Sequence, residues 1–339
     1  MPKVELHVHL EGAIRPATLL ALAQRNGRGL PIEDEAGLIA LYRFRDFPHF
    51  EEMYGTIIGC LNTPADYELI AYEFGRDCAG QNVRYAEVTF TIASHVRRNR
   101  LPWQTVLAGL NTGRAAARRD FGVDWGWVFD IDRNRPETQE QVLEIALAAR
   151  ECGAVALGLA GDEGRYPASV VAETFRRARE AGLPRVPHAG ELGGPERIWE
   201  TLRLLDPDRL GHGVRSIEDG TLVAYLQERQ LPLEVCPTSN IRLGVYPSYA
   251  AHPLRRLWDA GLLLTVNSDD PPMFGADLVH EYAVLVDHFG FTADELERVS
   301  LNGIRASLLP APAKARMETE FRAEFASLRQ ALTEDNYSR

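Results

Sequence analysis

Two histidines near the start of the chain are spaced so that they could bind one metal ion together. His7 and His9 lie in segment 4–10, which has the short apolar pattern of a β-strand. Because residues i and i+2 of a strand point to the same face, both imidazoles should face one point. Imidazole nitrogen is a preferred ligand of zinc. The pair fills about half of a zinc coordination shell, so other ligands must come from elsewhere.

Three further residues of the same chemical kind stand where other apolar runs end. His188, His212 and Asp269 lie in the motifs His-Ala-Gly-Glu, Gly-His-Gly and Asn-Ser-Asp-Asp. Three neutral imidazole nitrogens and one carboxylate suit a zinc ion that keeps one coordination position open for water. The predicted ligands of a single zinc ion are His7, His9, His188 and Asp269.

Carboxyl and imidazole groups beside this centre could move protons. A zinc ion lowers the pKa of its bound water to about 7, which makes the water a usable nucleophile. His212 and Asp269 are expected to orient that water and to support its deprotonation. Glu191 follows His188 by three residues, so its carboxyl group can donate a proton to a substrate. Asp270 is free to bind a substrate donor.

The elements that must position these residues alternate between short apolar runs and helix-like stretches. Such alternation predicts parallel strands joined by right-handed crossovers. Eight strand candidates over 339 residues favour a closed (β/α)8 TIM barrel over an open sheet. The strand candidates are 4–10, 83–90, 123–131, 154–159, 185–188, 209–212, 231–236 and 262–267. Segments with helical spacing lie at 65–79, 105–121, 137–152, 169–181 and 195–205.

Two stretches go beyond the minimal barrel. Residues from about 30 to 62 are rich in aromatic side chains and too long for a simple connection, so we expect a helical insertion after the first strand. The insertion could be a lid over the site or an extra packing layer. The chain looks helical after residue 277, and no repeat or linker divides it. We therefore predict one domain over residues 1–339.

The barrel explains why residues about 260 positions apart in the sequence should meet. Active sites of such barrels are built at the C-terminal ends of the strands. His7 and His9 end the first predicted strand, His188 the fifth and His212 the sixth, while Asp269 follows the eighth. The fold thus predicts that these side chains share one rim.

Composition excludes several other classes of protein. The net charge of −11 argues against a nucleic-acid backbone or an anionic membrane as the main partner. No apolar run reaches the roughly 18 residues of a membrane span, and no leader precedes the first strand. The 4 cysteines are far apart, which suits free thiols and a cytoplasmic location. Lys3 and Lys314 are the only lysines.

The ordered motifs resemble the adenosine deaminase family of the amidohydrolase superfamily. They begin with His-x-His-Leu-Glu-Gly at 7–12 and Leu-Ala-Gly-Asp-Glu at 159–163, and the motifs of His188, His212 and Asp269 follow. Cys-Pro-x-Ser-Asn at 236–240 belongs to the same set. The likeness extends over roughly residues 2–305. Other amidohydrolases bridge two metals with a carboxylated lysine from a middle strand, and this chain has no lysine there.

The resemblance implies a zinc-dependent barrel enzyme that hydrolyses the exocyclic amine of a 6-aminopurine to the 6-oxo product and ammonia. It implies one zinc ion per chain, held by the four ligands named above. Glu191 resembles the residue that protonates purine N1, and His212 and Asp269 resemble the residues that activate water. Gly161 resembles the backbone donor to N3, and Asp270 the partner of N7. His9 is a further predicted substrate contact.

The substrate itself is less clearly marked. Enzymes that act on adenosine commonly carry aspartate where this chain has Glu11, near the ribose 5′-hydroxyl. Glu11 resembles the adenine deaminase and aminodeoxyfutalosine deaminase branches, whereas the motif around Gly161 resembles the nucleoside branch. Arg242 could meet a polar or acidic 5′ substituent or lie on the surface. We favour adenosine or a 5′-modified relative such as aminodeoxyfutalosine, with free adenine as the alternative.

Two readings from other classes remain open at the level of sequence. A phosphoesterase with a His-x-His barrel strand would usually carry an Asp-x-His near the end, and segment 268–270 has none. A non-catalytic nucleoside-binding protein would be marked by loss of a ligand or of the proton donor, yet Glu191, His212 and Asp269 are present. The oligomeric state is not indicated by the sequence.

Overall fold

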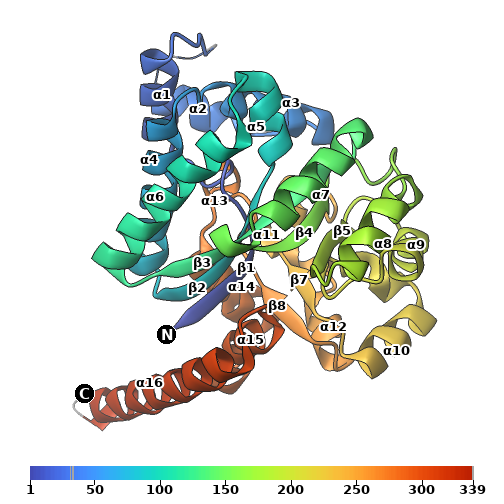
Figure 1. Cartoon of the computed structure of the whole chain (residues 1–339). Coiled ribbons are helices and arrows are strands. Elements are labelled where there is room, and N and C mark those ends of the chain that lie inside the picture. Colours follow the sequence, from blue (N-terminus) through green and yellow to red (C-terminus); the bar gives the residue numbers. More distant parts are fainter. Residues whose placement is uncertain (31, 33, 338–339) are drawn as a thin grey trace.

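The computed structural model describes residues 1–30, 32 and 34–337, and within them eight strands form one parallel sheet in the order β1 to β8 (Figure 1). The strands are β1 (Lys3–His9), β2 (Val83–Phe90), β3 (Asp124–Asp132), β4 (Ala154–Ala160), β5 (Arg185–Ala189), β6 (Leu210–His212), β7 (Leu233–Val235) and β8 (Leu264–Val266). Each predicted strand is present, with ends displaced by at most two residues. The structure confirms the predicted (β/α)8 barrel.

The sheet closes into a barrel just beyond β8. Val8 of β1 forms a parallel bridge with Asp269. The backbone N–H of Asp269 donates to the carbonyl of His7 at 3.0 Å, and the N–H of His9 donates to the carbonyl of Asp269 at 2.9 Å. The closing hydrogen bonds are therefore made by three of the predicted metal ligands, which fixes their backbones relative to one another.

Helices surround the barrel and join consecutive strands (Figure 1). In the first half they are α1 (Pro16–Arg25), α2 (Glu35–Leu41), α3 (Phe47–Gly59), α4 (Pro64–Gly80), α5 (Ile92–Asn99), α6 (Trp103–Phe121), α7 (Gln139–Ala148) and α8 (Ala172–Glu180). In the second half they are α9 (Pro195–Leu205), α10 (Gly220–Arg229), α11 (Pro237–Arg242), α12 (Leu254–Asp259), α13 (Pro271–Phe274), α14 (Leu278–Phe289), α15 (Ala293–Ala306) and α16 (Ala311–Tyr337).

Extra helices occupy the stretch between β1 and β2. The predicted insertion at about 30–62 includes α2 and α3, and α1 already precedes it; residues 31 and 33 lie outside the described residues. Phe50 of α3 stacks on Phe274 of α13 with ring centroids 5.7 Å apart. Because α13 follows β8, this contact attaches α3 to the rim of the barrel.

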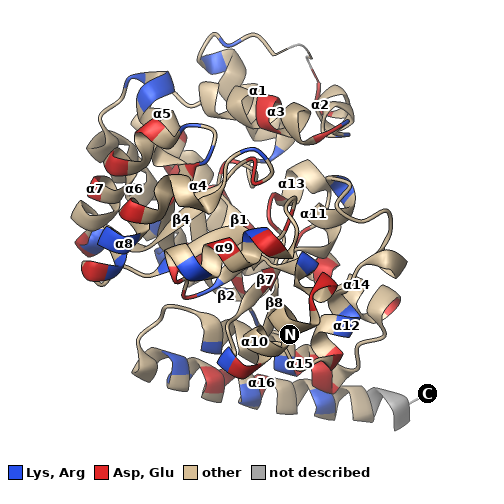
Figure 2. Ribbon diagram, turned by 90° about the vertical axis from the view of Figure 1, so that its right-hand side faces the viewer, with Lys and Arg blue, Asp and Glu red and all other residues tan. Residues whose placement is uncertain are grey.

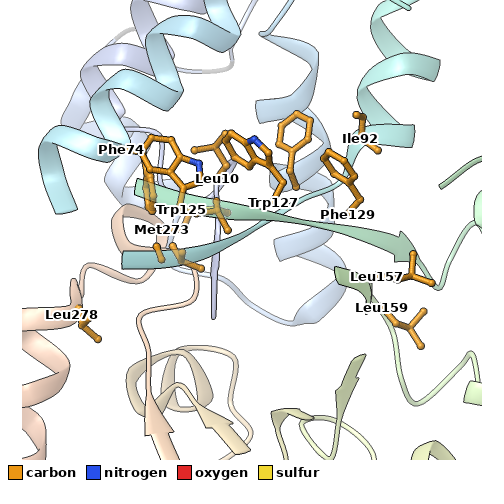
Figure 3. Packing of buried hydrophobic residues seen from close by; sticks show 14 of the residues in the cluster. Leu10, Phe74, Ile92, Trp125, Trp127, Phe129, Leu157, Leu159, Met273 and Leu278 are labelled. Carbon is orange, nitrogen blue, oxygen red and sulfur yellow. The ribbon is translucent and has the colours of Figure 1, made fainter. Parts of the chain in front are cut away.

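The hydrophobic core lies between the barrel and its helices. Trp125 and Trp127 of β3 are fully buried, and their rings meet edge to face with centroids 5.6 Å apart. Figure 3 shows both indoles beside Phe74 of α4 and Phe129. Burying a large apolar side chain stabilises the fold by roughly 1.5–3 kcal/mol, so this layer holds β3 firmly against its neighbours.

The C-terminal helices α15 and α16 cover the end of the barrel where the strands begin. Val4, Leu6 and Tyr85 pack there against residues of α15 and α16, including Phe321 and Phe325. Basic and acidic residues alternate over the outer helices, including α16 (Figure 2). In the part of the chain that the structure describes, no helix is both long and apolar enough to cross a membrane.

Candidate metal centre and active site

Five side chains converge at the C-terminal rim of the barrel. One potential ligand atom from each of His7, His188, His212 and Asp269 lies within 4.8 Å of the others, and all four residues are buried. Asp269 Oδ1 lies 3.4 Å from Nε2 of His7 and 3.3 Å from Nε2 of His9. Asp269 Oδ2 lies 3.9 Å from Nε2 of His212. The carboxylate therefore presents one oxygen to His7 and His9 and the other to His212.

Unusual backbone conformations aim two of these side chains. His212 and Asp269 adopt φ values of 59° and 65°, a left-handed conformation that is unfavourable for residues with a Cβ atom. His212 is the last residue of β6, and Asp269 follows β8 after Asn267 and Ser268, at places where the chain turns sharply to point the side chain inward. Gly211 leaves room beside them, since a Cβ atom there would lie 2.8 Å from Cε1 of His7.

A buried chain of charged groups orients the His7 ring through its Nδ1 atom. Nδ1 of His7 hydrogen-bonds to Oε2 of Glu234 at 2.8 Å. Nε of Arg209 lies 2.5 Å from Oε1 of Glu234, and Arg209 also pairs with Glu87. Burial opposes ionisation of Glu234, but Arg209 and His7 outweigh it and hold its pKa below the usual value. An ionised carboxylate on Nδ1 leaves Nε2 of His7 facing the other ligands, as in many metal sites.

A second chain of polar groups orients His212. Nδ1 of His212 lies 3.3 Å from Nδ2 of Asn240, and Oδ1 of Asn240 lies 3.0 Å from Nε2 of His252. Burial lowers the pKa of His212 to about 3 and outweighs the opposing effect of Asp269. His212 is therefore a neutral imidazole whose Nδ1 accepts from the Asn240 amide, which leaves the hydrogen on Nε2, 3.6 Å from Glu191.

Glu191 lies in a loop held by another carboxylate. Glu163 accepts hydrogen bonds from the backbone N–H groups of Gly190 at 2.7 Å, Glu191 at 3.2 Å and Gly193 at 2.9 Å. Burial, with the negative charges of Asp269 and Glu163, raises the pKa of Glu191 to about 8. At neutral pH the Glu191 carboxyl group thus carries a proton that it can donate.

The electrostatics of the ring cluster favour a cation. Burial opposes protonation of His7 and His9, yet the surrounding carboxylates raise their pKa values to about 10 and about 9. Nε2 of His9 lies 3.3 Å from Nε2 of His188. Among the described residues, Nε2 of His7 and Nδ1 of His188 have no hydrogen-bond partner although both are buried. These donors fit a single divalent metal ion, which would satisfy facing imidazole nitrogens and the carboxylate together.

A cavity of about 420 Å³ opens beside the cluster. It is lined by His9, His188, Glu191, His212, Asp269 and Asp270 on the barrel side. Residues of α3, including Phe47, Phe50, Tyr54 and Ile58, form the opposite wall. The predicted insertion therefore contributes directly to the cavity, whose volume is that of a small-molecule site.

Asp270 and Gly161 are two predicted substrate contacts that line the cavity. Oδ1 of Asp270 has no hydrogen-bond partner among the described residues, and burial together with Asp269 raises the pKa of Asp270 well above its usual value. Gly12 gives Asp270 its space, because a Cβ atom there would overlap Oδ1 at 1.7 Å. Gly161 lines the cavity at the end of β4, with a φ of +100°.

The predicted substrate contact Glu11 and the arginine Arg242, for which the sequence left a substrate contact or a surface position open, both lie outside the cavity lining. Both carboxylate oxygens of Glu11 are engaged, by the N–H of Thr91 at 2.9 Å, Nε2 of His95 at 2.9 Å and the hydroxyl of Tyr54 at 3.0 Å. Glu11 does not belong to the cavity lining, so it stands behind Tyr54 and its substrate role stays a prediction. Arg242 also lies outside the lining, where its Nε donates to the carbonyl of Phe274 at 3.1 Å.

Sequence reasoning assigned no role to several of these residues. Glu163 and Asn240 were part of recognised motifs, but their partners could not be read from spacing. Glu234 did leave a signal, because it is the single charged residue of the apolar segment 231–236. Asp130 of β3 was also missed: it lines the cavity and is 2% exposed. Its Oδ1 has no hydrogen-bond partner among the described residues.

Comparison with known proteins agrees with this geometry. The adenosine deaminase family model matches residues 2–323. An aminodeoxyfutalosine deaminase of Streptomyces coelicolor is 41% identical over 323 residues, covering 94% of this chain and 83% of that protein. The crystal structure of an adenine deaminase from Arthrobacter aurescens superposes with a TM-score of 0.90 at 34% identity, covering 95% and 98% of the two chains.

A further solved structure bears on the metal. An amidohydrolase of Burkholderia ambifaria, solved with bound zinc, superposes with a TM-score of 0.89 at 29% identity and covers 98% of this chain and 93% of its own. The match of the family model to almost the whole chain, with the barrel and its histidine and aspartate cluster, shows that the chain belongs to the adenosine deaminase family and is a metal-dependent deaminase.

Proposed function

We propose that the protein uses one zinc ion to hydrolyse the 6-amino group of a purine nucleoside, giving the 6-oxo product and ammonia. The observation that carries this proposal is the buried carboxyl group of Glu191, which burial and the negative charges of Asp269 and Glu163 favour in its protonated form. It faces the cavity beside His212, whose Nε2 lies 3.6 Å away. Hydrolysis of an aromatic amine needs a proton for the ring and a base for the water. Glu191 can supply the proton, and the carboxylate of the metal centre can act as the base.

The metal and its ligands are assigned as the sequence predicts. His7, His9, His188 and Asp269 would hold zinc, with Glu234 fixing the orientation of His7. When bound, zinc acts as a Lewis acid that makes a water molecule nucleophilic near neutral pH. His212 would contact that water and not the metal, because its Nδ1 is bound to Asn240 and its Nε2 faces Glu191.

The proton transfers follow from the positions of three side chains. Glu191 donates its proton to purine N1, which lets the ring accept the electron pair displaced when water attacks C6. Asp269 Oδ2 lies 3.9 Å from Nε2 of His212, so the Nε2–H of His212 can donate a hydrogen bond that orients the water while the Asp269 carboxylate accepts the proton that the water loses. Transfer of a proton to the amino group then lets ammonia leave, and the 6-oxo purine remains.

Two other groups orient the base. Burial and the negative charge of Asp269 raise the pKa of Asp270 well above its usual value, which favours the protonated carboxyl group that could donate a hydrogen bond to purine N7. Gly161 lies in the cavity lining, where its backbone N–H can meet N3. Contacts at N1, N3 and N7 would fix the ring in its plane and present C6 to the water.

Asp130 favours a nucleoside over the free base. Its buried oxygen has no hydrogen-bond partner among the described residues, and an unpaired buried acceptor is costly unless a ligand donates to it. A ribose hydroxyl supplies such a donor, whereas the base is already matched by Glu191, Gly161 and Asp270. Adenine remains the second candidate because an adenine deaminase structure is 34% identical to this chain.

A substitution at Asp130 tests the sugar contact. We expect Asp130→Ala to raise KM for the nucleoside about tenfold, the size of one lost hydrogen bond to a charged or buried group, and to leave hydrolysis of adenine unchanged. Asp130→Asn keeps an acceptor oxygen and should lose less. Steady-state kinetics on both substrates measures the difference, and an equal loss on adenine would contradict sugar recognition.

The decisive experiment is an ammonia-release screen of the zinc-loaded enzyme. The substrates are adenosine, 2′-deoxyadenosine, 5′-methylthioadenosine, aminodeoxyfutalosine, N6-methyl-AMP and adenine. Efficient release from one or more nucleosides supports the proposal, whereas release from adenine alone would reverse the preference. The cytoplasmic location, the one-domain organisation and the absence of a nucleic-acid partner stay predictions from the sequence.

A further inference from the structure

The mouth of the cavity carries two arginines for which the proposed chemistry has no use. Arg97 and Arg98 form the last turn of α5, which follows β2 directly, and both side chains line the cavity. Their exposure contrasts with the buried His188 and Glu191 at the inner end. Basic residues mark this end of α5 in Figure 2. The arginines therefore face the part of a substrate that lies farthest from the reacting amine.

These guanidinium groups are not committed to a protein partner. Neither Arg97 nor Arg98 makes an ion pair or a side-chain hydrogen bond with any residue that the structure describes. The third arginine of the lining, Arg135, is paired with Asp132 at 3.8 Å. Burial and the positive charges of Arg97, Arg135 and Arg28 lower the pKa of Arg98. The strongest charges acting on Arg98 are thus repulsive, and an anion would relieve them.

Helix α3 of the insertion packs against the side chain of Arg98. Gly55 of α3 lies against its guanidinium, since a Cβ atom on Gly55 would be 2.9 Å from Nη2. Gly59, one turn later, faces the aliphatic part, with the corresponding Cβ 3.9 Å from Cδ. Because neither glycine has a side chain, the Arg98 side chain can pack closely against this face of α3, between α3 and α5. The guanidinium is partly preorganised, which lowers the entropy cost of binding a ligand.

We propose that Arg97 and Arg98 form a subsite for an oxyanion carried on the 5′ side of the nucleoside substrate. This inference rests on the proposed function and adds a substrate class to it, namely 6-aminopurine nucleosides with a carboxylate or phosphate group. Guanidinium groups bind both anions through paired N–H donors. Arg242, the arginine that the sequence suggested for such a group, lies outside the lining, and the α5 pair takes its place.

The test compares neutral and anionic substrates that share the same base and sugar. Adenosine is the neutral substrate, adenosine 5′-carboxylate carries the carboxylate, and adenosine 5′-monophosphate carries the phosphate. We expect wild-type enzyme to prefer at least one anionic substrate over adenosine in kcat/KM. Arg97→Gln/Arg98→Gln should lower kcat/KM for that substrate about 10- to 100-fold, mainly through KM, and change adenosine less than about threefold. The preferred anion identifies the source.

Arg100→Gln is the matched control. Arg100 follows α5, is exposed and does not line the cavity, so Arg100→Gln removes one positive charge from the same region without touching the subsite, and each single variant, Arg97→Gln and Arg98→Gln, is compared with it. The control should keep the anionic preference. Equal turnover of neutral and anionic substrates by wild-type enzyme, or an equal loss on all substrates in the double variant, would overturn the subsite.

A binding measurement separates this inference from the proposed function. If no purine releases ammonia, deamination fails, and calorimetric binding of adenosine 5′-carboxylate and adenosine still tests the subsite. Tighter binding of the carboxylate by wild-type protein, lost in the double variant and weakened by salt, supports the arginine pair. Equal affinities for the two compounds would reject it whatever the enzyme's reaction.

Discussion

Glu191 can act as an acid because its surroundings disfavour the ionised carboxylate and so raise its pKa. Its carboxyl group is buried with Asp269 and Glu163 nearby, and together they raise its pKa to about 8. Glu163 holds the loop through three backbone hydrogen bonds and so keeps the two carboxylates close. Glu163 therefore positions the proton donor, and together with Asp269 it favours the protonated form of Glu191.

Replacing Glu191 with Gln should remove the proton while preserving the shape. We expect turnover to fall by about 10²–10⁴, the usual contribution of a general acid, with the metal content unchanged. In the parent enzyme, kcat/KM should decline as the pH rises through about 8, since the acid is then lost. Rate measurements against pH and metal analysis check both points. An active Glu191→Gln enzyme would show that the proton comes from elsewhere.

At the scale of elements, the short strands β6 to β8 deliver the chemistry. Each is three residues long, and His212, Glu234 and Asp269 lie on these strands or soon after them. The left-handed backbones at His212 and Asp269 are tolerated because strand pairing and the barrel closure hold both neighbours. Such local strain at a site requires support from the surrounding structure.

Glu234 of β7 provides a test of that support. Glu234→Gln keeps the volume but weakens the hold on Nδ1 of His7, so metal affinity should fall about 10- to 100-fold. Titration with a metal-competing chelator measures the affinity. Glu228→Gln on the exposed face of α10 is the control and should bind as the parent does. Unchanged affinity in Glu234→Gln would mean that the barrel backbone alone orients His7.

The insertion depends on a cap at the start of α4. Oδ2 of Asp66 accepts from the backbone N–H groups of Asn62 at 2.7 Å and Thr63 at 2.8 Å, and from Nδ2 of Asn26 at 2.8 Å. Burial opposes ionisation of Asp66, but these hydrogen bonds outweigh it and lower its pKa. The ionised group thus joins α1 to α4 and fixes one end of the insertion.

Removing this cap should destabilise the fold. We expect Asp66→Ala to lower the free energy of unfolding by about 1–2 kcal/mol, as for other helix caps. Because the folded pKa lies below the ordinary 3.8, the stabilisation is complete above pH 3.8 and is lost as the pH falls through the folded pKa. Urea unfolding of Asp66→Asn and the parent at several pH values checks this. A difference that persists at the lowest pH would point to packing instead.

At the scale of the whole molecule, the metal centre is also a closure of the barrel. Its predicted ligands come from β1, β5 and the segment after β8. A bound ion would therefore connect strands that are distant in the sequence and stabilise the folded state by its binding free energy. Stability and metal content should be linked in this protein.

Chelation gives the corresponding prediction. Removal of the metal with an excess of chelator should lower Tm by several degrees, since a ligand at about 100 times its Kd contributes roughly 2.7 kcal/mol. His188→Ala should bind no zinc, be inactive, and show no change in Tm on chelation. Calorimetry with metal analysis tests both proteins. An equal Tm of parent protein with and without chelator would argue against a metal that joins the strands.

The sequence by itself determined the barrel and the chemical kind of its site. Apolar runs separated by helical spacing predict eight strands because local periodicity reflects which face is buried, and strand ends carrying His7, His188 and Asp269 predict a shared rim. The resemblance of the ordered motifs added the roles of Glu191 and His212, and the family is confirmed.

Tertiary structure decided everything that depends on which side chains become neighbours across the barrel. Glu234 meets His7 from 227 positions away, and Arg98 meets the cavity only because α3 folds over the rim. Glu11 looks like a substrate residue in its motif, yet burial against His95 places it behind Tyr54. Local spacing cannot give these contacts, because strand register, barrel closure and the packing of the insertion set them together.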